Sequence, residues 1–362
     1  MKLLKKIIFI LLISSCANIV SPTGGDKDID PPKILNIQTI EKSKNMKCEV
    51  IKFEFNEHIQ VNKWQEYFYI SPPIKKKDQK KIKGNVLFLT IEDTLNNNIT
   101  YNFALNRCIK DNNEGNILDT LNYLFTRKET TDTHNISGSL QDSYTLNALE
   151  NAWVMLFNEN LNDTVIFKNT PNYIAKTNKN GFFNFPNLKT MNYKIVALTG
   201  FDFVYNKDEK IAFSNNIINA KTDSFISLFA FDPIIKIDSL TQKSAPLKSD
   251  SIITNDTNTI IQEKEFSTGK LKINTKNSSC IFQLLQDEKV IIQICFSETP
   301  YLIEGIVAGN YNLKYISDNN NDSVWSTGSW ERRIQPEKVI DYPSEIKIRS
   351  NWDLEVDWVI ED

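Results

Sequence analysis

The sequence predicts an all-β protein made of tandem small β-sandwiches on an amino-terminal tether. Short runs that alternate apolar and polar residues recur along the chain, and clusters of Asn, Gly, Pro or Asp bound them. Regularly spaced strands with turn signals and no helical period are typical of a sandwich. Residues 187–198 (NLKTMNYKIVAL) and 305–316 (GIVAGNYNLKYI) also align without a gap, so we expect one sandwich type to occur twice. Chance similarity between two hairpins is the alternative.

The first 32 residues predict export followed by a flexible segment. Lysines within Met1–Lys6 precede the apolar run Ile7–Ile13, which is too short to span a bilayer, since a spanning helix needs roughly 20 apolar residues. The run ends at Ser14-Ser15-Cys16. We therefore expect a signal peptide over residues 1–15 and a tether over residues 16–32, which are rich in Gly, Pro and acidic side chains.

The basic head, short apolar core, small residues and cysteine resemble a bacterial lipobox. The resemblance implies that Cys16 becomes the first mature residue and carries lipid, and that Ala17, in place of Asp, favours transfer to the outer membrane. The acidic stretch after Cys16 resembles the surface-export signals of Bacteroidota lipoproteins. We therefore expect a lipid-anchored outer-membrane protein on the extracellular face. An ordinary cysteine in a signal anchor and a plain solvated spacer are the alternatives.

Residues 33–129 predict the first sandwich. Alternating runs occur at residues 50–55, 85–91 and 100–105. Four phrases in this part resemble the bacterial Ig-like domain of Bacteroidota lipoproteins: IKFEFNEHIQV (51–61), YISPPI (69–74), LTIEDTLNNNITYNFALNRCIKDNNEGN (89–116) and YLFTRKE (123–129). The resemblance implies an Ig-like fold here.

Residues 134–232 and 268–362 predict the second and third sandwiches. In the second, we expect a strand that carries Ala152, Val154 and Leu156, and a hairpin through Asn180-Gly181, which is a strong hairpin signal. The phrases ISGSLQDSYTLNALENAWVMLF (136–157) and TNKNGFFNFPNLKTMNYKIVAL (177–198) resemble the transthyretin-like, carboxypeptidase-regulatory-like fold. The resemblance and the internal repeat imply a transthyretin-like sandwich in both blocks.

Residues 233–267 separate these two blocks. They are rich in Ser, Thr, Lys, Asp and Asn and poor in aromatic residues, so we expect a linker or long loop. Ser239 and Ser251 each lie between an Asp and an apolar residue. These segments resemble O-glycosylation acceptor sites of exported Bacteroidota proteins, and the resemblance implies glycosylation at both serines.

Two disulfides are predicted among the remaining cysteines. In CIFQLLQDEKVIIQIC (280–295), a two-residue turn at Asp287-Glu288 places Cys280 directly opposite Cys295 on antiparallel strands. Opposed Cα atoms lie about 4.5–5.5 Å apart, near the range of a disulfide. A second disulfide, Cys48–Cys108, is expected within the first sandwich. Free buried thiols are the alternative for both pairs.

No motif in the sequence predicts catalysis. There are two histidines, His58 and His134, and neither has a partner at motif spacing. A nucleophile elbow, a zinc-binding helix, a P-loop and paired C-x-x-C motifs are absent from the sequence. The net charge of −3 also provides no basic surface for nucleic acid. We therefore expect a protein that is not an enzyme, has no cofactor and does not bind nucleic acid.

One loop carries a partial calcium pattern. Asp318, Asn320, Asp322 and the Val324 carbonyl stand at alternate positions, as do the first ligands of a calcium loop. Ser323 stands where such a loop needs Gly, and Ser329 stands where it needs a bidentate Glu, for which Glu331 is the nearby substitute. Calcium is therefore a candidate ion for this loop, and an Asn-rich turn between strands is the alternative.

Tryptophans cluster near the carboxyl end. Trp325 and Trp330 lie in a polar loop with Arg332 and Arg333, and this composition predicts contact with a partner. Trp352 and Trp358 fall on one face of a final strand and predict core packing instead.

These observations predict a non-catalytic outer-membrane lipoprotein that scaffolds, or is an accessory binding subunit of, an outer-membrane protein complex. A glycan-binding or adhesive surface protein is the alternative, and a hydrolase with an unrecognised site is a third. The first hypothesis predicts co-purification with a membrane complex, whereas the second predicts exposed tryptophans with affinity for carbohydrate.

Overall fold

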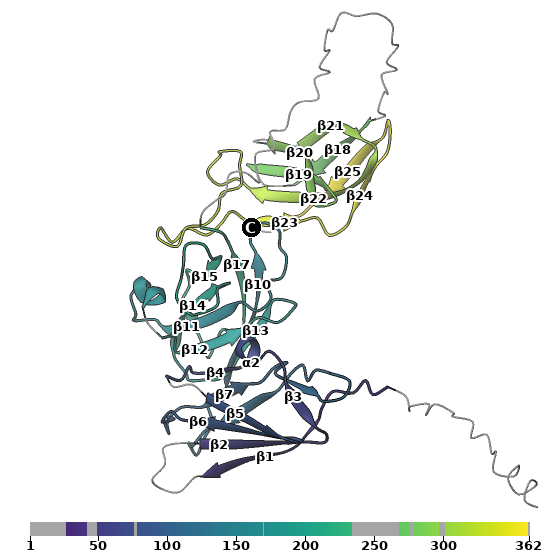
Figure 1. Cartoon of the computed structure of the whole chain (residues 1–362). Helices are drawn as coiled ribbons and strands as arrows, with labels where there is room; N and C mark the ends of the chain where they lie inside the picture. Colours follow the sequence, from purple (N-terminus) through teal and green to yellow (C-terminus); the bar gives the residue numbers. More distant parts are fainter. Residues whose placement is uncertain are drawn as a thin grey trace, which may run out of the picture. The chain divides into compact units, whose positions relative to one another are not determined.

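The structure is a computed structural model, and it describes residues 27–41, 49–75, 78–168, 170–233, 268–275, 279–296 and 301–360. Strands dominate these residues, which contain one short helix, α2 (Trp64–Tyr67), and one 3-10 helix, η1 (Asp163–Phe167). The predicted all-β class is confirmed (Figure 1). None of the helices in these ranges has the length and apolar character needed to cross a membrane. Contacts divide the chain into two units.

The first unit contains residues 1–67, 76–94 and 105–121. Its described strands form an antiparallel sheet and a separate strand pair. The sheet has the order β1 (Ile34–Glu41), β2 (Glu49–Phe55), β6 (Val86–Ile91), β5 (Asp78–Lys83), and β3 (Ile59–Val61) pairs with β8 (Ile109–Asp111). Alternation explains β2, because Phe53 and Phe55 are fully buried while Lys52 and Glu54 form an ion pair of 2.9 Å on the other face.

The second unit contains residues 68–75, 95–104 and 122–362. Its first sheet is antiparallel, with the order β4 (Tyr69–Ser71), β7 (Tyr101–Ala104), β9 (Asn122–Phe125). Phe103 of β7 is fully buried and packs edge to face against Phe125 of β9, with ring centroids 6.4 Å apart.

The second sandwich of the chain follows, with two sheets. The smaller has the order β13 (Phe182–Leu188), β10 (His134–Asp142), β17 (Phe225–Ala230), and β10 runs parallel to β17. The larger has the order β12 (Tyr173–Lys176), β11 (Trp153–Asn158), β14 (Asn192–Leu198), β15 (Ile211–Phe213), and β16 (Ile218–Asn219) also pairs with β14. Val154 and Leu156 of β11 point into the shared core, as expected.

The third sandwich repeats this topology. Its smaller sheet has the order β21 (Tyr301–Val307), β18 (Thr268–Asn274), β25 (Asp353–Asp357), and β18 runs parallel to β25. Its larger sheet has the order β20 (Lys289–Phe296), β19 (Cys280–Gln286), β22 (Gly309–Ser317), β23 (Val339–Asp341), and β24 (Ile346–Ile348) pairs with β22.

The two aligned phrases occupy equivalent strands, β14 and β22. Their aligned tyrosines, Tyr193 and Tyr311, are both buried. The Tyr193 hydroxyl donates to the Lys189 carbonyl and the Tyr311 hydroxyl to the Val307 carbonyl, each at 2.9 Å and four residues back along the chain. The similarity of the phrases is therefore structural.

The predicted hairpin through Asn180-Gly181 is wrong. A turn does occur there, and Gly181 has φ of +74°, but the strands on its two sides belong to different sheets. β12 pairs with β11, whereas β13 pairs with β10. The turn therefore carries the chain from one layer of the second sandwich to the other. A side chain at Gly181 would also strike the Leu140 carbonyl, since a Cβ there would lie 2.4 Å from that oxygen.

The predicted Cys280–Cys295 disulfide is also wrong. The turn at Asp287-Glu288 forms, but Leu284 faces Ile292 while Leu285 faces Val290, so a bulge at Ile291 shifts the register by one residue. Cys280 consequently faces Phe296, and Cys295 faces Ile281. Cys280 is buried, Cys295 is exposed and both thiols are free. Burial raises the pKa of the Cys280 thiol to about 11, which keeps it protonated at neutral pH.

Trp358 is buried, as predicted, but Trp352 is not. Trp352 precedes the first residue of β25 and lies in a turn, where its N–H donates to the Arg349 carbonyl at 3.3 Å. Its side chain is 63% exposed. The alternation that places Trp358 therefore does not extend to Trp352.

Candidate interaction surfaces

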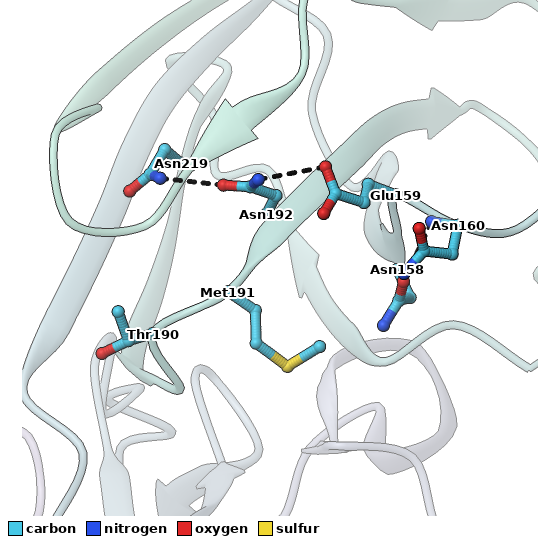
Figure 2. A pocket seen from close by; sticks show the side chains of 7 residues that line it. All are labelled: Asn158, Glu159, Asn160, Thr190, Met191, Asn192 and Asn219. Carbon is cyan, nitrogen blue, oxygen red and sulfur yellow. Dashed lines mark hydrogen bonds between the residues drawn. The ribbon is translucent and has the colours of Figure 1, made fainter.

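A polar pocket of about 300 Å³ lies where β11 ends and β14 begins (Figure 2). The register places Asn192 of β14 opposite Asn219 of β16, and the Asn219 side-chain amide donates to Asn192 Oδ1 at 2.8 Å. Asn192 in turn donates to Glu159 Oε2 at 3.0 Å. Asn158, Asn160, Thr190 and Met191 complete the lining. The pocket offers hydrogen bonds to a polar ligand, but with a single carboxylate and no histidine or cysteine it has no pair of groups for acid–base catalysis.

The β22–β23 loop (residues 318–338) joins the third sandwich to the second. Trp330, predicted as a partner contact, is buried among second-sandwich residues that include Met155, Phe157 and Phe213. Its ring packs edge to face on Phe213, with centroids 5.1 Å apart. The Arg333 guanidinium lies over the Trp330 ring, 3.4 Å from its centroid. The prediction of an exposed anchor at Trp330 is therefore wrong, because the chain itself covers this side chain.

Trp325 contacts the second sandwich in a separate place. Its ring lies 5.0 Å from that of Tyr144, in the turn after β10, and its indole N–H donates to the Glu337 carbonyl at 3.0 Å. The Tyr144 hydroxyl donates to Gln283 of β19 at 3.0 Å, and the buried Lys314 ammonium donates to the Tyr144 carbonyl at 2.8 Å. Trp325 is half-buried by these contacts and does not stand free for a partner. Of the four predicted residues, Arg332 is the one that is exposed.

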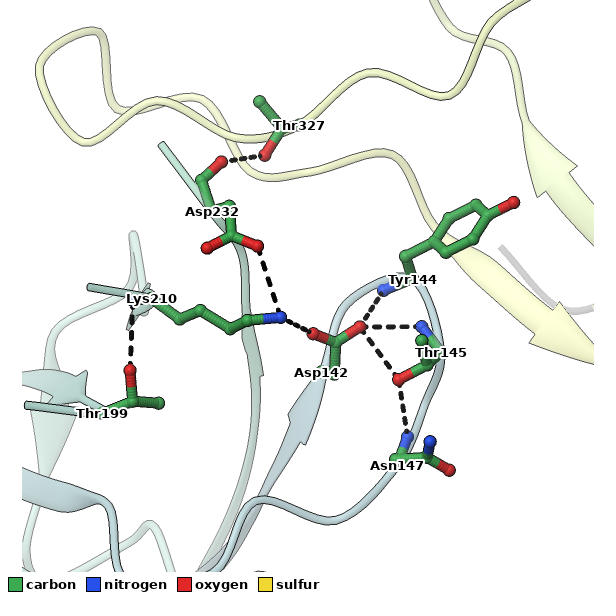
Figure 3. Close-up of polar contacts among 8 residues, drawn as sticks. All are labelled: Asp142, Tyr144, Thr145, Asn147, Thr199, Lys210, Asp232 and Thr327. Atoms are coloured by element: carbon green, nitrogen blue, oxygen red, sulfur yellow. Dashed lines mark hydrogen bonds and ion pairs between the residues drawn. The ribbon is translucent and has the colours of Figure 1, made fainter. Parts of the chain in front are cut away.

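An ion-pair network within the second sandwich lies next to the same joint (Figure 3). Lys210 bonds to Asp142 and also lies 3.3 Å from Asp232. Asp142 is nearly buried and accepts hydrogen bonds from the N–H groups of Tyr144 and Thr145, at 3.0 and 2.8 Å. Burial raises the pKa of Asp142, but the Lys210 ammonium and these N–H groups outweigh it and hold the pKa below its usual value. The Thr327 hydroxyl of the β22–β23 loop donates to the Asp232 carbonyl at 2.7 Å.

The candidate calcium residues hydrogen-bond to their own loop. Asp318 accepts from the N–H groups of Asp322 and Ser323, at 3.1 and 3.0 Å. Asp322 accepts from the Val324 N–H at 2.8 Å and from the Asn320 amide at 2.8 Å. Nowhere in the described ranges do three His, Cys, Asp or Glu side chains form a group that could hold a metal. Calcium at Asp318, Asn320, Asp322 and Val324 stays a prediction, and the hydrogen bonds give these side chains a structural role.

Sequence reasoning missed Glu337, the carboxylate that organises this loop. Its two oxygens accept from the N–H groups of Asn319 and Ser326, at 2.9 and 2.8 Å. The side chain is buried, and burial raises its pKa. Glu331, expected as the nearby carboxylate, instead lies 3.8 Å from Lys207. The spacing of a calcium loop does not indicate Glu337, because this residue follows Asp318 by 19 positions.

A second cavity, of about 310 Å³, lies beside the joint between the second and third sandwiches. Lys194, Ser214, Asn215, Ile217, Trp330 and Arg333 contribute to its lining. The loop is held at the rim by the Asn215 amide, which donates to the Arg333 carbonyl at 3.3 Å. Ile217 is 44% exposed and Ile334, next to Arg333, is 50% exposed. An apolar wall, a guanidinium and accessible isoleucines together suit an inserted side chain of another protein.

Several predicted sites lie outside the described residues. Cys16, Ser239 and Ser251 are among them, so lipidation and glycosylation stay predictions. Cys48 is outside as well, whereas Cys108 is described and buried, so the Cys48–Cys108 pair also stays a prediction.

Comparison with known families identifies one part of the chain. Residues 28–127 match the family model of the bacterial Ig-like domain. This part coincides with the phrases that carry the Ig-like resemblance, so the chain is an all-β protein with an Ig-like domain in its amino-terminal third. The comparison with curated proteins gave no match.

Solved structures give weaker similarity. One is GBS52, the minor pilin of Streptococcus agalactiae, with 12% identity, 63% of this chain and 95% of that chain covered, and a TM-score of 0.20. Another is the Bacillus anthracis TIE protein, with 10% identity, coverage of 94% and 59%, and a TM-score of 0.18. BcpA, the major pilin subunit of Bacillus cereus, has 11% identity, coverage of 51% and 64%, and a TM-score of 0.19. TM-scores this low carry no argument about this chain.

Proposed function

We propose that this chain is a non-catalytic lipoprotein of the outer membrane that scaffolds, or serves as an accessory binding subunit of, an outer-membrane protein complex. In this proposal lipid on Cys16 anchors the chain at the extracellular face. The Ig-like domain and two transthyretin-like sandwiches form its extramembrane part. The sequence of the amino terminus supports the anchor, and the all-β architecture supports a binding role.

The observation that carries the proposal is the joint between the second and third sandwiches. The buried Trp330, the Trp325–Tyr144 contact and the hydrogen bond from the Thr327 hydroxyl to the Asp232 carbonyl all connect the two. Sandwiches joined by buried aromatic contacts hold their outer surfaces at a fixed spacing. A scaffold needs this property, whereas a chain of independently moving domains does not provide it.

The partner is proposed to bind at the cavity beside Trp330 and Arg333. Ile217 and Ile334 present apolar surface at this place, and Arg332 is exposed nearby. Arginine is a frequent residue at protein interfaces. A partner that inserts an apolar side chain here would cover both isoleucines and leave Arg332 at the edge of the interface.

A pull-down of the native lipoprotein from outer membranes in mild detergent tests the proposal. We expect a stoichiometric outer-membrane protein to co-purify with the wild type and to be lost with Cys16→Ala. Ile217→Asp should reduce the recovered partner at least tenfold, because it places a charge on the apolar wall of the cavity. Ile291→Asp is the matched control, since Ile291 is 50% exposed on β20 and does not line the cavity. Recovery of the chain alone, or full recovery of the partner with Ile217→Asp, would contradict the proposal.

A further inference from the structure

One face of the smaller sheet in the second sandwich combines exposed phenylalanines with small polar side chains. Ser139 in the central strand β10 faces Phe182 of β13 on one side and Ser227 of β17 on the other. Along β10, Ser137 faces Phe225 and Gln141 faces Phe229. The alternate residues of these strands, among them Ile136, Leu140 and Leu228, point into the core. We call the outward set the phenylalanine face.

The phenylalanines of this face are largely accessible. Phe182 is 49% exposed, Phe225 is 56% exposed and Phe229 is 39% exposed. Phe225 and Phe229 are four residues apart on one strand, which corresponds to about 13 Å. Phe182 lies across the serine positions of β10, two strands away, or roughly 10 Å. The rings therefore stand around the short side chains of Ser137, Ser139 and Ser227.

The third sandwich shows that the fold does not require aromatic residues here. The equivalent face, on β21, β18 and β25, carries paired charges. Lys270 bonds to Glu304 at 2.6 Å, Lys272 bonds to Glu355 at 2.7 Å, and the Asn274 amide donates to Asp357 at 2.7 Å. These polar pairs suit a surface in contact with water. The same sheet in the second sandwich instead exposes apolar surface, which a protein seldom keeps in a cluster without a use.

The chemistry of the face indicates an uncharged, hydroxyl-rich ligand. Among its outward residues Phe182, Asn184, Ser137, Ser139, Gln141, Phe225, Ser227 and Phe229 there is no Lys, Arg, Asp or Glu. The face therefore has no counter-charge for an ionic partner. The hydroxyls and amides between the rings can donate and accept hydrogen bonds, and the rings offer flat apolar surface.

A second copy of the chain fits this face less well. Ser137 donates to the Asn184 side chain at 2.9 Å, and the Gln141 amide donates to the Leu146 carbonyl at 3.1 Å. Two such faces stacked on each other would also bury the Ser139 and Ser227 hydroxyls, and each polar group left without a partner costs about 1–3 kcal/mol. A sugar chain avoids this cost, because its hydroxyls supply partners along the face while its C–H groups cover the rings. We propose that the phenylalanine face of β10, β13 and β17 binds a neutral polysaccharide. The proposal is independent of the outer-membrane partner proposed above.

Binding of the full-length, detergent-solubilised chain to immobilised polysaccharides tests this inference. The probes are neutral glucan, xylan, mannan and galactan, with the acidic polygalacturonate as comparison. We expect retention on at least one neutral polysaccharide and none on polygalacturonate. Phe225→Ala combined with Phe229→Ala should lower the affinity at least tenfold. Phe201→Ala is the matched control, because Phe201 is fully exposed and lies outside the face.

A second variant keeps the test independent of folding. Ser139→Arg retains all three rings but places a long charged side chain between them, and it should abolish retention without a change in circular dichroism or melting temperature. Absence of retention on every neutral polysaccharide would overturn the proposal, as would equal retention of the Phe225→Ala/Phe229→Ala variant. The proposal would also be overturned if the wild type formed a concentration-dependent dimer that Phe225→Ala/Phe229→Ala abolishes, because the face would then bind a second copy of the chain.

Discussion

The second and third sandwiches each contain a buried tyrosine whose hydroxyl makes the same hydrogen bond. Tyr193 and Tyr311 are each buried, and each donates to a carbonyl four residues earlier, at the entry to the central strand of its larger sheet. Burial leaves the phenol without water, so the carbonyl is the group that satisfies it. The sequence already indicated this equivalence, because the two tyrosines belong to Asn-Tyr pairs that align between the two phrases.

Tyr193→Phe and Tyr311→Phe should each lower the free energy of unfolding by about 1 kcal/mol, since each removes the hydrogen bond from a buried hydroxyl to a backbone carbonyl. Urea unfolding of the two single variants and the double variant measures the losses. The sites lie in different sandwiches, so the two losses should add. A loss at one position alone would show that the tyrosines are not equivalent.

The interactions of Asp142 predict that the free energy of unfolding depends on pH. Its pKa is lower in the folded chain, because the Lys210 ammonium and two N–H groups stabilise the carboxylate more than burial destabilises it. The contribution of Asp142 is therefore complete above the unfolded pKa of about 3.9 and is lost as pH falls through the lower folded value. Asp142→Asn should cost roughly 2 kcal/mol at pH 7, and this cost should shrink as the pH falls below about 3.9. Chemical unfolding of wild type and variant from pH 7 to pH 3 measures this difference, and a constant difference would contradict it.

In the β19–β20 hairpin, one extra residue changes how the two strands pair. The sequence predicted the turn at Asp287-Glu288 correctly, but not the bulge at Ile291. Because side chains alternate across a strand, the one-residue shift moves Cys280 and Cys295 to different faces. The hydrophobic pattern alone could not reveal the bulge, since Ile291, Ile292 and Ile294 are all apolar and allow either register.

The same turn carries an identifiable strain. Asp287 has φ of 48° and Glu288 has φ of 63°, a region that favours glycine. Glu288→Gly should raise the free energy of unfolding by up to about 1 kcal/mol, because it removes the steric cost of a side chain in this conformation. Glu355→Gly in the middle of β25 is the control and should lower it. Thermal unfolding measures both, and a loss of stability for Glu288→Gly would contradict the argument.

Sequence reasoning succeeded where alternation decides an element and failed where the chain changes layer. Phe53 and Phe55 are buried as their spacing predicts, and so are Val154 and Leu156. The Asn180-Gly181 pair predicted a turn correctly, but it did not predict how the flanking strands pair, because a local signal does not determine which sheet each strand joins. Trp330 was predicted as exposed because its neighbours in sequence are polar, whereas its neighbours in space come from the second sandwich.

At the scale of the whole molecule, Trp330 links the stability of two sandwiches. Trp330→Ala should cost about 3–5 kcal/mol, since it empties a buried site between Phe213 and Arg333. We also expect the second and third sandwiches of the wild type to unfold in one calorimetric transition, and Trp330→Ala to separate this transition into two. Trp352→Ala is the control, because Trp352 is 63% exposed, and it should change stability by less than about 0.5 kcal/mol. One unchanged transition in Trp330→Ala would show that the sandwiches do not depend on this contact.

The parallel pairing of β10 with β17, and of β18 with β25, has a mechanical consequence. In each case the first and last strands of a sandwich lie side by side, over Ser137–Asp142 with Phe225–Ala230 and over Lys270–Asn274 with Asp353–Asp357. Because the strands are parallel, a pull on the two ends of a sandwich drags them past each other in opposite directions. All hydrogen bonds of the pair then bear the load together instead of opening one after another. In both sandwiches this pair of strands therefore resists a pull along the chain through hydrogen bonds that are loaded in shear.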